Sequence, residues 1–398
     1  MNEPLPTSLT WNNSTLPLTH QFAFVAGDAL SIPTLQILKP DGRLHAAADM
    51  PELNAETALR MFDTCVFTQV FDERMLSCQR QGRISFYMTC VGEEGTVVGS
   101  AAGLHDQDMI LGQYREHAAL RYRGFTTEQF MNQLFSNEKD LGKGRQMPVH
   151  YGSKALHYQT ISSPLATQIP QAVGVAFGQK IKQSEQVTLC YFGEGAASEG
   201  DCHAAMNMAS VLKTPVIFFC RNNAYAISTP ATEQYASDGI AVRAVGYGMP
   251  SIRVDGNDIL AVLLAVQRAR ALALRTQTPV LIEAMTYRVG AHSSSDDPSG
   301  YRLAEEAEAW QALSAITRFK TWLIEKEWIT QAQCDALYET YKVEVLAQVK
   351  QAEQVAKPVL RTMIEDVYAK PTSQLEQQYK QLKQHLSTSG LTTQPEEQ

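Results

Sequence analysis

The sequence lacks both a long apolar segment and an excess of basic residues. No run of about 18 uncharged apolar residues occurs in the 398-residue chain, so no membrane-spanning helix is expected. The net charge is −8, which disfavours a nucleic-acid partner because such binding depends on clustered Lys and Arg. The first 18 residues have neither the basic-then-apolar order of a secretory signal nor the Arg-rich composition of a mitochondrial presequence. We therefore predict a cytoplasmic location.

Paired cysteines are also missing. The seven cysteines form an odd set without a CxxC spacing, and Cys190 and Cys220 lie within apolar runs. This pattern is typical of reduced thiols in a protein core rather than of disulfides or a zinc site.

Apolar runs do alternate with helical patterns between about 160 and 290. The runs 187–192, 216–220, 251–255 and 280–285 are typical of strands, and amphipathic or Ala/Leu-rich stretches at 198–213 and 258–276 separate them. Repeated strand–helix units of this length predict an α/β fold, a parallel sheet with helices on both faces. Helices expected at 56–81 and 131–144 would flank the same sheet.

The character of the chain changes after about residue 300. Charged, helix-forming sequence follows, in which Leu337, Tyr341, Val345 and Val349 recur every four residues as one apolar stripe. We predict an N-terminal extension at 1–50, an α/β domain at 51–300, and a helical region at 301–386 that packs on the core or on a partner. The polar residues 387–398 have no periodicity and are expected to be disordered.

A Gly-Glu-Gly triplet follows the apolar run 187–192 directly. In a parallel sheet, ligands collect at the carboxyl ends of the strands, and Gly193 and Gly195 would let a diphosphate approach the backbone. Glu194 would supply the hard oxygen that a phosphate-bound Mg²⁺ needs. Taken alone, the triplet is more typical of a tight turn than of a cofactor site.

A second polar group follows the next apolar run, 216–220. Asn223 offers an amide oxygen and Tyr225 a carbonyl oxygen to the same metal, while Arg221 can pair with phosphate oxygens. Asn222-Asn223 could be a plain turn, but one strand–helix–strand unit separates it from the triplet, so that two adjacent strand ends would face one ligand.

This joint pattern resembles the thiamine diphosphate enzymes. Residues 191–201 and 219–230 are similar to the alpha subunits of branched-chain 2-oxoacid dehydrogenases, and the resemblance extends through 79–88, 112–116, 161–168 and 285–293. It implies thiamine diphosphate and Mg²⁺ as cofactors, with a K⁺ ion as a further possibility. The implied reaction is the oxidative decarboxylation of branched-chain 2-oxoacids with acyl transfer to lipoyl groups, in the catabolism of branched-chain amino acids.

The resemblance also implies roles for single residues. His292 would contact the diphosphate and act in acyl transfer, and its imidazole can exchange protons near neutral pH. A wall for the acyl chain would comprise Phe86, Tyr114 and Leu165. K⁺ would be bound by Ser162, Pro164, Thr167 and Gln168. Ser162, Ser163, Pro164 and Thr167 could instead cap the following helix, and the two roles are compatible. The cofactor contacts implied in this way are Gln113, Tyr114, Arg115, Ser163, Leu165, Gly193, Glu194, Gly195, Ala196, Arg221, Asn223 and His292.

The expected partners come from the same resemblance. A beta subunit would form an alpha2beta2 heterotetramer and supply the glutamate that activates the cofactor, and a lipoyl-bearing acyltransferase would receive the acyl group. Two alternatives stay open: a pyruvate or acetoin dehydrogenase alpha subunit, and a non-catalytic scaffold subunit. Substrate preference distinguishes the first alternative, and cofactor binding distinguishes the second.

Overall fold

The computed structural model describes residues 8–11, 14–19, 21–22, 27 and 29–390. The chain divides into two units, Met1–Ser31 and Ile32–Gln398. In the first, β1 (Ser8–Trp11) and β2 (Ser14–Pro17) form an antiparallel hairpin.

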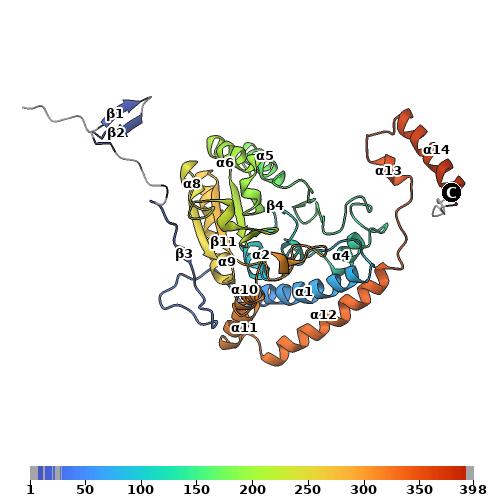
Figure 1. Cartoon of the computed structure of the whole chain (residues 1–398), viewed down its shortest axis with the longest axis horizontal. Coiled ribbons are helices and arrows are strands. Elements are labelled where there is room, and N and C mark those ends of the chain that lie inside the picture. Colours follow the sequence, from blue (N-terminus) through green and yellow to red (C-terminus); the bar gives the residue numbers. More distant parts are fainter. Residues whose placement is uncertain (1–7, 12–13, 20, 23–26, 28, 391–398) are drawn as a thin grey trace, which may run out of the picture. The chain divides into compact units, whose positions relative to one another are not determined.

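The second unit is built on a seven-stranded parallel sheet with the strand order β3-β10-β11-β7-β6-β4-β5 (Figure 1). The expected strands are all present, and the α/β fold class is confirmed. The strands are β3 (Thr34–Leu35), β4 (Met109–Leu111), β5 (Tyr158–Gln159), β6 (Thr188–Gly193), β7 (Val216–Asn222), β10 (Ser251–Asp255) and β11 (Val280–Met285).

The central strands are buried on both faces, which explains their continuous apolar sequences. Successive side chains point to opposite faces: Leu189 and Tyr191 of β6 belong to one core cluster, Cys190 and Phe192 to another. The first core is formed with α1 (Ala55–Arg80), α2 (Glu94–Ala102) and α9 (Ile259–Thr276). The second is formed with α5 (Gln168–Ile181) and α6 (Gly200–Leu212). All seven cysteines are buried as free thiols, as predicted.

Helix α2 lies very close to α9, because glycine recurs on it every four residues. A Cβ atom at Gly99 would lie 2.8 Å from the carbonyl oxygen of Ile259, and one at Gly103 would lie 2.7 Å from the Cβ of Val266. Side chains at these positions would separate the two helices. The close packing fixes the start of α2, where Glu93 and Glu94 lie.

The predicted apolar stripe lies on α12 (Gln331–Ala352), which packs alongside α1 (Figure 1). Tyr341, Val345 and Val349 are buried, so the stripe packs within this chain. The helix expected at 131–144 is wrong in its bounds: α4 (Thr127–Leu134) ends earlier, and Ser136 has a φ of 48°, which no α-helix continues through.

The remaining helices are short or lie toward the C-terminus. The last described helix, α14 (Ser373–Thr388), extends into the predicted tail. Residues 391–398 of that tail lie outside the described part. No helix of the described part is long and apolar enough to cross a membrane. Two short strands that follow β7, β8 (Tyr225–Ala226) and β9 (Thr229–Pro230), pair with each other. The remaining helices are α3 (His117–Tyr122), α7 (Ala231–Gln234), α8 (Arg243–Gly246), α10 (Ala304–Gln311), α11 (Ala315–Glu325), α13 (Thr362–Glu365) and α14 (Ser373–Thr388).

Candidate active site

A cavity of about 420 Å³ lies at the carboxyl edge of the sheet. Loops that follow five adjacent strands, β5, β4, β6, β7 and β11, contribute its walls, as expected for a ligand site in a parallel sheet. The cavity brings together most of the predicted site residues. It is lined by Gln113, Tyr114, Leu165, Gly193, Glu194, Gly195, Ala196, Glu199, Arg221, Asn223, Tyr225, Ala226, Ile227, Arg288 and His292.

The Gly-Glu-Gly turn is held against neighbouring backbone. The Gly193 amide donates a hydrogen bond to Oε1 of Gln113 at 2.9 Å. A Cβ atom at Gly195 would lie 2.6 Å from the Cβ of Ala226, closer than carbon atoms can approach. Glycine is therefore required at Gly195 by the loop that follows β7, and the turn presents bare backbone to the cavity.

Glu194 is a buried carboxylate with one oxygen atom unsatisfied. The residue is 1% exposed. Its Oε2 accepts a hydrogen bond from the backbone amide of Asn223 at 3.2 Å, whereas Oε1 has no hydrogen-bond partner. Burial raises the pKa of this carboxyl group. An unpaired buried carboxylate oxygen is costly, and a cation would remove the cost. This ligand set, one carboxylate beside the side-chain amide oxygen of Asn223, fits a hard divalent ion that also binds phosphate.

The predicted carbonyl ligand is placed beside the same site. The Tyr225 carbonyl oxygen accepts a hydrogen bond from Nη1 of Arg288 at 3.3 Å, and the Tyr225 hydroxyl donates to Glu306. The described part holds no group of three or more His, Cys, Asp or Glu residues that could bind a metal. The proposed ligand set has a single carboxylate.

Arg221 lies beneath the cavity between two buried carboxylates. It is 1% exposed, and its two terminal nitrogens form ion pairs with Glu93 and Glu116. Burial alone would raise the pKa of Glu93, but Arg221 and Arg115 outweigh it and hold that pKa below its usual value. Arg221 reaches the cavity wall with its charge already balanced by protein groups.

His292 is held by two arginines. Its Nδ1 lies 3.1 Å from Nη2 of Arg115 and 3.5 Å from Nη1 of Arg288, and the amide of His292 donates to Asp296 at 2.7 Å. Arginine only donates hydrogen bonds, so Nδ1 is the acceptor and Nε2 carries the proton of the neutral ring. Burial and the charges of Arg115 and Arg288 lower the pKa of His292 to about 4. The ring is therefore neutral near pH 7.

Three of the residues predicted to contact the cofactor or the acyl chain do not line the cavity. Arg115 is buried and donates to the Thr89 carbonyl as well as to His292. Ser163 lies with its hydroxyl 2.8 Å from Nε2 of His150. Phe86 is partly buried against the core. The ring of Tyr114, by contrast, lies edge-on to that of His292, with the ring centroids 6.0 Å apart.

The residues predicted to bind K⁺ surround the start of α5. Thr167 occupies the position before the helix, but its side chain makes no capping hydrogen bond. Gln168 is buried, and its amide nitrogen donates to the Tyr191 carbonyl at 3.0 Å. Helix capping by Thr167 therefore does not account for the segment. K⁺ binding by these residues stays a prediction.

Among the charged residues of the site that are not predicted from the sequence are Arg288 and Glu93. Arg288 lies three residues beyond the end of β11, and β11 pairs with β7. Its position just after a predicted strand could therefore have identified it as a candidate site residue. Glu93 precedes α2 and contacts β7 only through the folding of the chain. No pattern in the sequence links Glu93 to the site.

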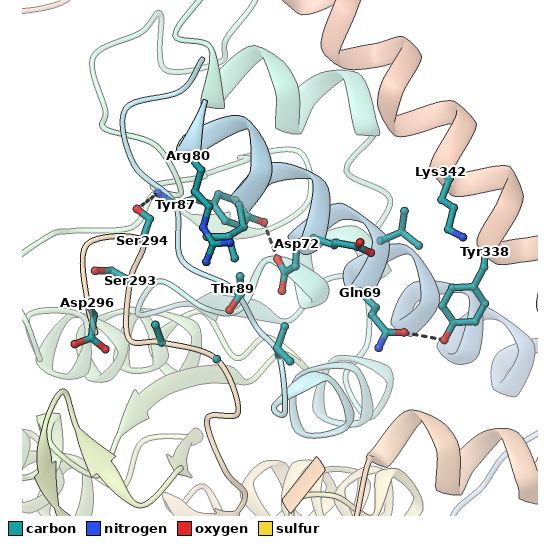
Figure 2. A pocket seen from close by; sticks show the side chains of 16 residues that line it. Gln69, Asp72, Arg80, Tyr87, Thr89, Ser293, Ser294, Asp296, Tyr338 and Lys342 are labelled. Atoms are coloured by element: carbon teal, nitrogen blue, oxygen red, sulfur yellow. Dashed lines mark hydrogen bonds between the residues drawn. The ribbon is translucent and has the colours of Figure 1, made fainter. Parts of the chain in front are cut away.

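A second cavity, of about 580 Å³, lies on the other side of the loop that carries His292 (Figure 2). Gly290, Ala291, Ser293 and Ser294 line it, opposite α1 and the segment 87–91. The loop is tied to that segment, because the Ser294 amide donates to the Tyr87 carbonyl at 3.0 Å. Figure 2 also shows the Tyr87 hydroxyl directed at Asp72 of α1, to which it donates at 2.6 Å. The position of His292 thus depends on packing at both sides of its loop.

Comparison with known proteins identifies close relatives of this fold and site. The family described as "Dehydrogenase E1 component" matches residues 62–361. The chain is 48% identical over 369 residues to the protein named "2-oxoisovalerate dehydrogenase subunit alpha, mitochondrial" of Homo sapiens, covering 92% of this chain and 83% of that protein. The protein of the same name in Dictyostelium discoideum is 50% identical over 357 residues, covering 89% of this chain and 81% of the relative.

The names of these relatives correct one prediction. They are called mitochondrial, which contradicts the predicted cytoplasmic location. That prediction was wrong because it depended on the composition of the first 18 residues alone.

Proposed function

The chain belongs to the family of dehydrogenase E1 components, and from this we propose that it is the alpha subunit of a branched-chain 2-oxoacid dehydrogenase. The reaction is the oxidative decarboxylation of branched-chain 2-oxoacids, such as 2-oxoisovalerate, with acyl transfer to the lipoyl groups of an acyltransferase. The family depends on thiamine diphosphate. We propose a mitochondrial location, after that of the relatives.

The unpaired, buried Oε1 of Glu194 is the observation that carries this proposal. Glu194, Asn223 and the Tyr225 carbonyl would hold Mg²⁺, and the bare backbone of Gly193–Ala196 would lie against the diphosphate. When bound, thiamine diphosphate supplies the electron sink for decarboxylation. The remaining proposed contacts are Gln113, Tyr114, Arg115, Ser163, Leu165 and Arg221, with K⁺ at Ser162, Pro164, Thr167 and Gln168.

His292 is the proposed proton-transfer residue. Arg115 and Arg288 occupy Nδ1, so Nε2–H is the group left free to donate a proton or a hydrogen bond into the cavity. A bound diphosphate would add negative charge nearby and raise the pKa of His292 from about 4 toward neutrality. Cofactor binding would thereby bring the imidazole into the range in which it exchanges protons efficiently.

The proposed acyl-chain pocket includes Tyr114 and Leu165, which line the cavity, with Phe86 as a further contact. A pocket of this kind distinguishes acyl chains by only a few kcal/mol for each methylene group. Comparison of kcat/KM for 2-oxoisovalerate and pyruvate in the reconstituted complex tests the assignment. Preference for pyruvate would favour the alternative of a pyruvate dehydrogenase alpha subunit.

A beta-subunit partner is supported by exposed apolar residues on α5 and α6, two helices that pack against each other. Ile181 is 68% exposed and Val211 70% exposed, and Phe177, Met208 and Leu212 lie exposed on the same two helices. Clustered exposed apolar residues are typical of a protein interface. Val211→Asp is expected to weaken association with the beta subunit, as measured by the mass of the complex in solution. Glu308→Gln on the exposed face of α10 provides a control.

Calorimetric titration of the reconstituted complex with thiamine diphosphate and Mg²⁺ tests the cofactor assignment. Binding is expected for the wild-type complex and a loss of at least tenfold in Mg²⁺ affinity for Glu194→Ala, because the single carboxylate of the set is removed. Absence of binding to the wild-type complex would refute the proposal and support a scaffold role. We also propose that residues 51–300 form the cofactor-binding domain, between an extension at 1–50 and the helical region at 301–386.

A further inference from the structure

Glu93 lies directly behind the proposed metal site, without touching the cavity. It immediately precedes α2, and it is completely buried (0% exposed). Its carboxylate contacts two residues of β7 and the loop that follows: Arg221 through an ion pair, and Asn223 through a hydrogen bond of 2.9 Å from Nδ2 to Oε1. A second cation, Arg115, lies with its Nε 3.9 Å from Oε1 of Glu93. Glu93 therefore holds a residue proposed to bind the metal.

The contact with Glu93 decides how the Asn223 amide is turned. An ionised carboxylate only accepts hydrogen bonds, so the NH₂ group of Asn223 must face Glu93. The carbonyl oxygen Oδ1 then faces the opposite way, where it also accepts from the Tyr225 amide at 3.3 Å. If the amide were reversed, two oxygen atoms would oppose each other and an NH₂ group would face the metal. Glu93 excludes that arrangement.

We infer that Glu93 is a positioning residue that presents the oxygen of Asn223, rather than its nitrogen, to the metal. This inference rests on the proposed function, because it concerns the Mg²⁺ that would accompany thiamine diphosphate. It assigns to Glu93 a role that no cavity-lining residue performs. Groups behind a metal ligand that fix its orientation commonly change metal affinity by about 10- to 100-fold when they are lost.

A purely structural role for Glu93 makes a different prediction. Arg221 is paired with both Glu93 and Glu116, so either carboxylate could serve only to neutralise it. Glu116 does not contact Asn223; it accepts hydrogen bonds from the amides of Gln113 and Tyr114. Glu116→Gln is therefore a matched control, since it removes one charge from the same arginine and leaves the Asn223 contact in place.

The test is calorimetric titration of the reconstituted complex with Mg²⁺ in the presence of saturating thiamine diphosphate. Glu93→Gln places an NH₂ group or a weaker acceptor beside Asn223, and the Kd for Mg²⁺ is expected to rise about tenfold or more. Glu116→Gln is expected to change it by less than about threefold. Equal increases in the two variants would overturn the inference, because they would show that the charge of Arg221 alone matters.

A compensating substitution gives an independent readout. Asn223→Asp presents oxygen on both sides, so it suits a glutamine at position 93 and opposes the native carboxylate there. In the Glu93→Gln background, Asn223→Asp is expected to lower the Kd for Mg²⁺ at least tenfold, and in the wild-type background to raise it or leave it unchanged. The same effect in both backgrounds would overturn the inference.

Failure of the proposed function can be told apart from failure of this inference. If the wild-type complex binds no Mg²⁺ with thiamine diphosphate, the proposed function itself is wrong. If Glu93→Gln does not fold, the double variant is compared with Asn223→Asp alone: tighter Mg²⁺ binding by the double variant supports the positioning role, and equal or weaker binding refutes it. Melting temperatures of all variants establish which of them are folded.

Discussion

Glu94→Gln is expected to stabilise the protein, and to do so more strongly at alkaline than at acidic pH. Glu94 lies in the first turn of α2, is 5% exposed, and accepts a hydrogen bond from the Gly92 amide at 2.9 Å. Burial is the main cause that raises its pKa to about 8, and the nearby Asp72 and Glu93 raise it further. Near pH 7 the carboxyl group is therefore largely protonated in the folded protein and ionised in the unfolded chain.

The magnitude follows from the two pKa values. Because the folded pKa exceeds the usual 4.5, the contribution of Glu94 to stability is complete below pH 4.5 and is lost as the pH rises to about 8. Each pH unit in this window corresponds to about 1.4 kcal/mol. The loss amounts to about 1.5 kcal/mol at pH 5.5 and about 4.5 kcal/mol at pH 8.5. Glutamine has no such loss, and its amide offers a donor and an acceptor like those of the protonated acid.

Denaturant unfolding of the full chain at pH 5.5 and pH 8.5 measures this effect. The difference in free energy of unfolding between Glu94→Gln and wild type is expected to grow by about 3 kcal/mol between the two pH values. Glu56→Gln is the matched control, because Glu56 also lies in the first turn of a helix, α1, but is exposed. A difference for Glu94→Gln that is independent of pH would show that Glu94 is not a neutral buried acid.

Other parts of the site lead to further predictions. Arg288→Met removes one of two cations beside His292 and is expected to raise the pKa of that histidine from about 4 by about one pH unit, measured as the pH dependence of its modification by diethyl pyrocarbonate; an unchanged profile would contradict the electrostatic account. Gly195→Ala forces a Cβ against Ala226 and is expected to weaken thiamine diphosphate binding about tenfold with the fold retained, measured by calorimetry and circular dichroism. Asp258→Asn weakens the cap of α9 and the hydrogen bonds that the carboxylate accepts from the amides of residues 37 and 38. The substitution is expected to lower the free energy of unfolding by about 1 to 2 kcal/mol and to accelerate proteolysis near residue 40. Proteolysis at the wild-type rate would refute this.

Much of the sheet was predictable because its strands are buried on both faces. Such strands have continuous apolar sequences, and the runs 187–192, 216–220 and 280–285 therefore stood out from the helices between them. The bounds of the helix expected at 131–144 were wrong, because α4 ends at Leu134 and the polar residues that follow form turns. Turn-forming residues such as Asn and Asp also occur in helices, so the sequence did not mark that boundary.

The site was predictable where it follows strand ends, and not elsewhere. Glu194 and Asn223 come directly after strands that pair with each other, so their convergence follows from topology alone. Glu93 reaches Asn223 from 130 residues away in the sequence, by the packing of α2 against the sheet. Arg221 was expected to be available to phosphate, but only the structure reveals two carboxylates already paired with it. Such pairings depend on tertiary distances that periodicity and spacing do not encode.

Gly99 of α2 and Gly103 at its C-terminal end control how precisely the proposed metal site is positioned. Gly99 and Gly103 bring α2 into contact with the backbone and side chains of α9, so the two helices cannot shift relative to each other without a clash. The start of α2 is therefore held in a fixed position. An added methyl group at Gly99 would collide with the carbonyl oxygen of Ile259 and push α2 away from α9, and Glu93 at the start of α2 would move with the helix. The position of Asn223, a proposed metal ligand, thus depends through Glu93 on the spacing of two helices that do not line the cavity.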